Sequence, residues 1–112
     1  MRLLSNKDAQ FFIACILEIL AELHDKKIIH RDVKPENFVV DENGYLKLVD
    51  LSIAKVVHNR TYTITGTPHY MAPEVLSGQG YNHSADLWSL GIILYEFIMG
   101  SVPFGDSLED PY

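Results

Sequence analysis

The sequence predicts an α+β fold that is mainly helical and contains one short β-hairpin. Three observations lead to this prediction. Apolar residues recur at helical spacing near the start of the chain, and an almost wholly apolar segment lies near its end. Between them, two short runs of β-branched and apolar residues flank an Asn-Gly pair. The 112 residues suffice for one domain at most.

The first helix is expected over residues 5–24. Ser5 and Asp8 have the spacing of a capping box, which places an acid at the positive end of the helix. Apolar side chains then recur at intervals of three and four residues, with polar side chains on the opposite side. The apolar set is Phe12, Ile13, Ile16, Ile19, Leu20 and Leu23. The pattern predicts an amphipathic helix packed against a core.

Two short strands are expected next, over residues 38–40 and 45–49. The turn between them contains Asn43 and Gly44, a pair that supplies the positive φ angles of a tight hairpin. From Asp50 to about Pro73 the chain has no regular period and is rich in threonine, which predicts a long loop. Loops of this length in compact domains usually carry function.

The last helix is expected over residues 84–99, where apolar side chains leave hardly any polar face. A helix that is apolar on all sides belongs in the middle of a domain. At roughly 24 Å, this helix is long for a chain of 112 residues to surround. We therefore expect it to be the centre of a domain larger than this chain.

Composition excludes several classes of protein. Nine basic and fifteen acidic residues give a net charge of −6, which disfavours a general binder of nucleic acid or of anionic membranes and leaves room for cationic partners. No apolar stretch approaches the ~20 residues of a membrane span, and the start lacks the apolar region of a signal peptide. The single cysteine, Cys15, cannot form an internal disulfide, so a reducing, cytoplasmic location is expected.

Three segments place chemistry-bearing residues in a specific order. Residues 30–37 read His-Arg-Asp-Val-Lys-Pro-Glu-Asn, residues 50–52 read Asp-Leu-Ser, and residues 71–74 read Met-Ala-Pro-Glu. Together they resemble the C-terminal half of the signature of eukaryotic serine/threonine protein kinases. The resemblance covers nearly all of residues 1–112. It implies a partial protein-kinase catalytic domain, namely the mainly helical large (C-terminal) lobe with its short hairpin, without the small lobe.

The resemblance implies ATP and Mg²⁺ as cofactors and assigns catalytic roles. Asp32 would accept the proton of a substrate hydroxyl, and Lys34 would counter negative charge on the transferred phosphate. Asn37 and Asp50 would supply the oxygen ligands that magnesium prefers. The competing interpretation makes Asp32 a surface turn residue and Asp50 a strand-end cap.

Leu51 and Ser52 depart from the usual Phe-Gly that follows the metal-binding aspartate. Leucine retains an apolar side chain beneath the metal site. Serine replaces a glycine whose backbone freedom lets the loop change state. Two interpretations stand, a tolerated substitution and a stiffened or damaged metal loop.

Residues 60–70 resemble the activation segment of the cyclic-nucleotide-dependent kinases within the basophilic (AGC) group, and they look most like the cGMP-dependent kinases. By this likeness Thr63 is the phosphorylation site and Thr65 its rival, and Arg31 and Lys55 would hold the added phosphate. The alternative is a flexible polar loop without regulation. Residues 102–112 likewise resemble members from unicellular eukaryotes.

Further positions take roles from the same likeness. Thr67 would line the catalytic cleft, and residues 66–70, beginning at Gly66, would receive the residue after the phosphoacceptor. Glu36 and Glu96 match a pair that binds an arginine upstream of the phosphoacceptor, which implies a protein substrate with basic residues upstream of its Ser or Thr. The alternatives are a solvated loop residue for Glu36 and an internal structural pair for Glu96.

Two more acids are assigned structural roles. Asp86 resembles the aspartate that hydrogen-bonds the backbone of the catalytic loop, and Glu74 resembles a member of a buried ion pair. Neither is expected to contact substrate.

Two functions follow. In the first, the chain is a segment of a serine/threonine kinase that is active only in a longer chain, with regulatory cyclic-nucleotide-binding domains elsewhere. The segment alone is expected to be inactive, because the Gly-rich loop, the ATP-binding lysine and its glutamate partner have no counterpart in it. In the second, the chain is a non-catalytic kinase remnant that acts as a binding module.

Overall fold

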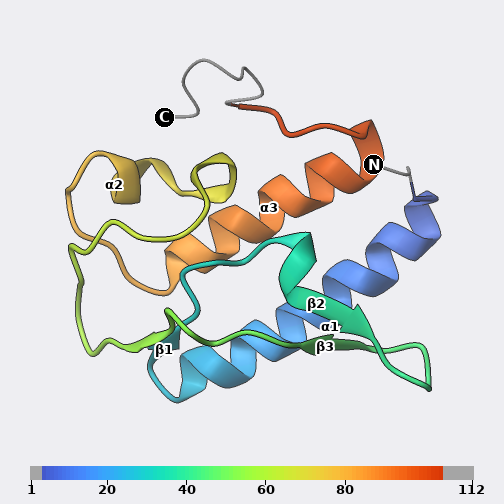
Figure 1. Cartoon of the computed structure of the whole chain (residues 1–112), viewed down its shortest axis with the longest axis horizontal. Helices are drawn as coiled ribbons and strands as arrows, with labels where there is room; N and C mark the ends of the chain where they lie inside the picture. The colour runs from blue at the N-terminus through green and yellow to red at the C-terminus, as the bar shows by residue number, and fades with distance from the viewer. Residues whose placement is uncertain (1–3, 105–112) are drawn as a thin grey trace.

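The fold was analysed in a computed structural model that describes residues 4–104 (Figure 1). Among these residues, the long first helix is followed by four short strands and then by two helices, which confirms the predicted α+β class. In order, the elements are α1 (Asn6–Asp25), β1 (Ile28–Ile29), the 3-10 turn η1 (Pro35–Asn37), β2 (Phe38–Val40), β3 (Leu46–Leu48), β4 (Lys55–Val56), the 3-10 turn η2 (Pro68–Tyr70), α2 (Pro73–Leu76) and α3 (Ser84–Met99). Residues 105–112, which hold most of the terminal segment likened above to unicellular eukaryotes, lie outside the described residues.

Helix α1 begins as its sequence predicts. The Ser5 hydroxyl oxygen accepts the backbone N–H of Asp8 at 3.1 Å and so caps the first turn. Ala9, Ile16 and Leu20 form the buried stripe of the helix. The cap fixes where the helix starts, and the stripe fixes which side faces the core.

Replacing Ser5 with alanine is expected to destabilise the first turn of α1 by about 1 kcal/mol, because the Asp8 amide loses its acceptor. Hydrogen exchange of the first-turn amides should then be about fivefold faster in the full-length protein that carries this chain. Ser5→Asp retains an acceptor and should exchange like the wild type. Equal exchange rates in all three proteins would contradict the capping role.

The β2–β3 hairpin forms as predicted, with Phe38 opposite Leu48 and Val40 opposite Leu46. The prediction that Asn43 and Gly44 both take positive φ angles is wrong for Asn43, since only Gly44 does so within this turn, at 86°. The Asp41 carboxylate explains the difference. Its Oδ1 accepts the backbone N–H groups of both Asn43 and Tyr45, which holds a wider, three-residue loop closed by one left-handed glycine.

The segment from Asp50 to Pro73 is more ordered than the sequence predicts. Strand β4 lies within it and pairs with β1, so that Ile28 faces Val56 and Ile29 faces Lys55. Further along, Thr61 forms a bridge with Tyr81. Two-residue strands have no period to detect, and their partners are distant in sequence, so this pairing left no local signal.

Helices α1 and α3 pack against each other, and the β2–β3 hairpin lies alongside α1 (Figure 1). Ile93 of α3 is completely buried, together with Ile16 and Leu20 of α1. The prediction of an apolar α3 holds, but within residues 4–104 only one side of the helix is covered. The exposed apolar residues on α3 are Leu87, Trp88, Leu94, Tyr95, Ile98 and Met99. Within the same residues, no helix combines the length and the apolar character that crossing a membrane requires.

Candidate functional site

Asp32 and Thr67, 35 positions apart in sequence, meet in one polar cluster with Lys34. The Thr67 hydroxyl donates to Asp32 Oδ1 at 2.8 Å. Lys34 Nζ donates to Thr67 Oγ1 at 2.9 Å and lies 3.5 Å from Asp32 Oδ2. The segment that begins at Asp50 is thus joined through Thr67 to the loop that follows β1.

Asn37 completes this cluster from the end of η1. Its side-chain Nδ2 donates to the backbone carbonyl of Asp32 at 2.6 Å and lies 3.3 Å from Asp32 Oδ2. The residue is 6% exposed, so its position is fixed by the surrounding chain. Within residues 4–104, the amide oxygen of Asn37 takes part in no hydrogen bond and remains available as a ligand.

His30 joins Asp50 to the same loop. The buried imidazole accepts the backbone N–H of Asp32 at Nδ1, at 3.1 Å, and donates from Nε2 to the backbone carbonyl of Asp50 at 2.5 Å. Nδ1 is therefore the accepting nitrogen of this ring and Nε2 the donating one. The sequence shows His30 only as the first residue of the 30–37 motif, and its bridging role was not predicted.

The Asp50 side chain is exposed and held in its charged form. Its Oδ1 accepts the backbone N–H of Ser52 at 2.9 Å. Hydrogen bonds from the Ser52 backbone and side chain lower the pKa of Asp50, with smaller contributions from His30 and Lys34. Ser52 therefore stabilises an ionised carboxylate at the position where the sequence raised the possibility of damage.

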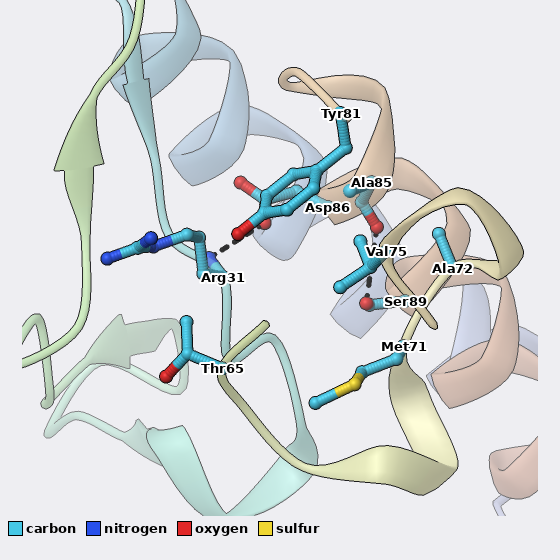
Figure 2. Close-up of a pocket in the computed structure, with 9 residues that line it drawn as sticks. All are labelled: Arg31, Thr65, Met71, Ala72, Val75, Tyr81, Ala85, Asp86 and Ser89. Carbon is cyan, nitrogen blue, oxygen red and sulfur yellow. Dashed lines mark hydrogen bonds between the residues drawn. The ribbon is translucent and has the colours of Figure 1, made fainter. Parts of the chain in front are cut away.

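The Asp86 carboxylate anchors the backbone of the loop that carries Asp32. This carboxylate is 1% exposed, and it accepts the backbone N–H of His30 at 2.8 Å and that of Arg31 at 3.0 Å. His24 Nε2 donates to it at 2.9 Å. Arg31 has a φ of 73°, a left-handed conformation that is costly for a residue with a Cβ. Figure 2 shows the Asp86 carboxylate against the Arg31 backbone, where it holds that conformation in place.

The two candidate phosphorylation sites of the threonine-rich segment, Thr63 and Thr65, lie in different surroundings. Thr63 is exposed, and its carbonyl accepts the Tyr81 hydroxyl. Lys55 Nζ donates to Thr61 at 3.0 Å and not to Thr63. Thr65 and Arg31 line one pocket beneath the segment (Figure 2). Among the described residues, Arg31 Nη1 is buried without a hydrogen-bond partner, while its Nε donates to the Ile53 carbonyl.

The remaining acids occupy distinct surroundings. The Tyr70 hydroxyl donates to Glu96 at 2.6 Å, and burial raises the pKa of Tyr70, with further contributions from Glu96 and from the negative charge of Glu36. Glu96 therefore influences the Tyr70 hydroxyl through a hydrogen bond and through its charge, and Glu36 through its charge alone. Glu36 is exposed. Glu74 forms no ion pair within residues 4–104.

Gly66 controls how closely the threonine-rich segment approaches the loop. Its φ is 109°, and a Cβ at this position would lie 2.4 Å from the backbone oxygen of Arg31. Gly66→Ala is expected to push residues 66–67 off the loop and to break the Thr67–Asp32 hydrogen bond. Amide exchange over residues 65–70 should become roughly tenfold faster or more in the full-length protein.

Gly44→Ala is the matched control, because Gly44 has a φ of 86° with nothing within 4 Å of an added Cβ. This variant should suffer backbone strain alone and leave residues 65–70 protected. If the two variants perturb residues 65–70 equally, the proposed contact of Gly66 with Arg31 is wrong.

Comparison with known proteins matches residues 1–111 to the family described as "Protein kinase domain". A cGMP-dependent protein kinase of Plasmodium berghei is 51% identical over 108 residues, and one of Toxoplasma gondii is 50% identical over 108 residues. A cAMP-dependent protein kinase type 3 of Saccharomyces cerevisiae is 48% identical over 102 residues.

These matches cover 96%, 96% and 91% of this chain but only 13%, 11% and 26% of the three relatives, so the chain spans about a quarter of their length or less. The resemblance to protein kinases of the cyclic-nucleotide-dependent type is confirmed. The α+β arrangement of residues 4–104 is accordingly part of a kinase fold. The chain belongs to the protein kinase family.

Proposed function

We propose that the protein that carries this chain is an ATP-dependent serine/threonine protein kinase, and that residues 1–112 form part of its catalytic domain. The observation that supports this most strongly is the cluster of Asp32, Lys34, Asn37 and Thr67. His30 links this cluster to Asp50. Acid, cation and amide thus converge on one region from two loops that are distant in sequence.

In the proposed reaction, Asp32 orients the substrate hydroxyl and accepts its proton. The Thr67 hydroxyl and Asn37 Nδ2 hold the carboxylate so that it presents a fixed oxygen. Lys34 carries the positive charge that counters the charge on the transferred phosphate. Its contact with Thr67 keeps the ammonium beside Asp32.

Asn37 and Asp50 are the proposed ligands of magnesium. The donor set fits this ion, because it offers an amide oxygen without a hydrogen bond among the described residues and an exposed, ionised carboxylate. Bound magnesium would neutralise charge on the nucleotide phosphates. Ser52 orients one oxygen of the Asp50 carboxylate.

Glu36, Glu96, Gly66 and Thr67 are the proposed contacts for the protein substrate. The shared influence of the two glutamates on Tyr70 supports a negatively charged surface for a basic residue upstream of the phosphoacceptor. Glu36 is exposed and available to such a residue, whereas Glu96 already accepts the Tyr70 hydroxyl. The cGMP- and cAMP-dependent relatives support regulation by cyclic-nucleotide-binding domains elsewhere in the full chain.

Phosphorylation of Thr63 is the proposed activating modification. Its exposed position makes it accessible to another kinase. Arg31 Nη1 is buried and has no hydrogen-bond partner among residues 4–104, and Lys55 donates to Thr61, two residues before Thr63. Both are therefore candidates to pair with the phosphate once the segment rearranges. Asp86 and Glu74 are proposed to be structural.

The test is a transfer assay with the full-length protein, Mg²⁺ and ATP. A serine peptide with upstream arginines should be phosphorylated, and replacing the arginines with alanine should lower kcat/KM about tenfold or more. Glu36→Gln should reduce this preference, and Glu42→Gln, which changes another exposed glutamate, should not. Absence of any transfer would instead favour the non-catalytic remnant.

A further inference from the structure

A second cavity lies apart from the proposed catalytic residues, where the end of α1 meets the β1–β4 pair and the start of α3. It is open to the surface and has a volume of about 240 Å³. Its polar lining consists of His24, Lys27, His58, Asn59, Asn82 and His83. None of these residues takes part in the proposed phosphoryl transfer, so that reaction does not explain why they are gathered in one pocket.

Ile29 and Val57 complete the lining, and its six polar side chains share one chemical property. Each of them can donate hydrogen bonds from nitrogen, and no carboxylate is among them. The chain as a whole has fifteen acidic and nine basic residues, so an acid-free lining stands out against its composition. Lys27 supplies an ammonium group to this lining. The cavity therefore suits an oxyanion.

A metal cation fits this cavity poorly. No group of three or more His, Cys, Asp or Glu side chains within residues 4–104 is arranged to hold a metal ion. His24 Nε2 already donates a hydrogen bond to Asp86. The His24 ring also contacts the His83 ring in a tilted arrangement, with 5.2 Å between the ring centroids. The lysine in the lining would also repel a cation.

The cavity has a direct connection to the catalytic loop. His24 lines the cavity and donates to the buried Asp86 carboxylate at 2.9 Å. The same carboxylate accepts the backbone N–H groups of His30 and Arg31. An anion that orders the His24 ring would therefore also restrain the anchor of the catalytic loop.

We propose that this cavity is a binding site for a phosphate-class oxyanion, with Lys27 and His83 as its main contacts and the His24 ring packed against His83. The phosphate group would come either from a free phosphate-bearing molecule or from a phosphorylated side chain of the same protein. Both sources present the same charged oxygens to the same donors.

Hydrogen exchange in the full-length protein tests the site, with inorganic phosphate as the probe and chloride at matched ionic strength as the reference. Phosphate should slow exchange over residues 24–31, 57–59 and 82–84. Lys27→Asn and His83→Asn should weaken the apparent phosphate affinity tenfold or more. Asparagine suits the positive φ of 63° at position 27, so Lys27→Asn removes the charge without adding backbone strain. Lys47→Asn, an exposed lysine on β3, is the matched control and should bind like the wild type.

Phosphatase treatment before the measurement distinguishes the sources. If a phosphorylated side chain occupies the cavity, the untreated protein is protected without added phosphate and treatment removes that protection. If a free phosphate compound is the ligand, both preparations need added phosphate. No protection of these segments in either preparation, or equal protection in Lys27→Asn and the wild type, would overturn the proposal. The readout is independent of kinase activity, so it stands or falls separately from the proposed function.

Discussion

Replacing Asp32 with asparagine is expected to lower the rate of phosphoryl transfer by about 10²- to 10⁴-fold in the full-length protein. Asparagine has nearly the same shape, but it cannot accept the proton of the substrate hydroxyl. It can still accept the Thr67 hydroxyl at Oδ1, whereas its amide nitrogen replaces the oxygen that faces Asn37 Nδ2 and Lys34 Nζ. ATP binding should therefore change little, and the loss should appear in kcat.

Single-turnover kinetics with a serine peptide, together with nucleotide binding by calorimetry, separate these effects. Asp25→Asn is the control, because Asp25 is an exposed aspartate at the end of α1. A variant at position 32 whose transfer rate stays within a factor of two of the wild type would remove Asp32 from the reaction.

Replacing Asp86 with alanine is expected to be among the most destabilising changes in the chain. Two buried backbone N–H groups, those of His30 and Arg31, lose their acceptor, and His24 loses its charged partner. Removing one member of such a buried network costs about 3–5 kcal/mol. Arg31 would no longer be held in its left-handed conformation, so the loop that carries Asp32 should become mobile.

Exchange of the His30 and Arg31 amides should rise by at least about 100-fold, since roughly 3 kcal/mol corresponds to that factor. Asp86→Asn retains one acceptor oxygen and should show a smaller rise. Asp41→Ala, in the exposed β2–β3 turn, is the control and should affect only that turn. Wild-type protection of residues 30 and 31 in Asp86→Ala would show that the anchor lies elsewhere.

The helices were predictable because their signals are local. Ser5 and the apolar stripe of α1 set one helix, and the apolar run of α3 set the other. The β1–β4 pair was missed because each strand has two residues and its partner is far along the chain. The Asp41 carboxylate changed the hairpin turn through side-chain contacts that the Asn-Gly rule does not include.

The candidate site was likewise predictable only in part, because some of its contacts are not local. Motif order brought out Asp32, Lys34, Asn37 and Asp50, because the chemistry of phosphoryl transfer fixes these residue types and their spacing. The motifs did not identify His24, which lies on an amphipathic helix and hydrogen-bonds Asp86, 62 positions further along the chain. Nor did it show that Lys55 would be held by Thr61. Contacts of this kind depend on the tertiary fold and leave no pattern in a single sequence.

Asn37 and Asp50 are expected to bind one divalent ion beside Asp32. A crystal structure of the full-length protein with Mn²⁺ and a non-hydrolysable ATP analogue tests it most directly, because manganese is located by its anomalous scattering. We expect a manganese peak at about 2.1 Å from Asn37 Oδ1 and from an Asp50 carboxylate oxygen. A bound nucleotide whose metal contacts neither residue would show that Asn37 and Asp50 are not the metal ligands.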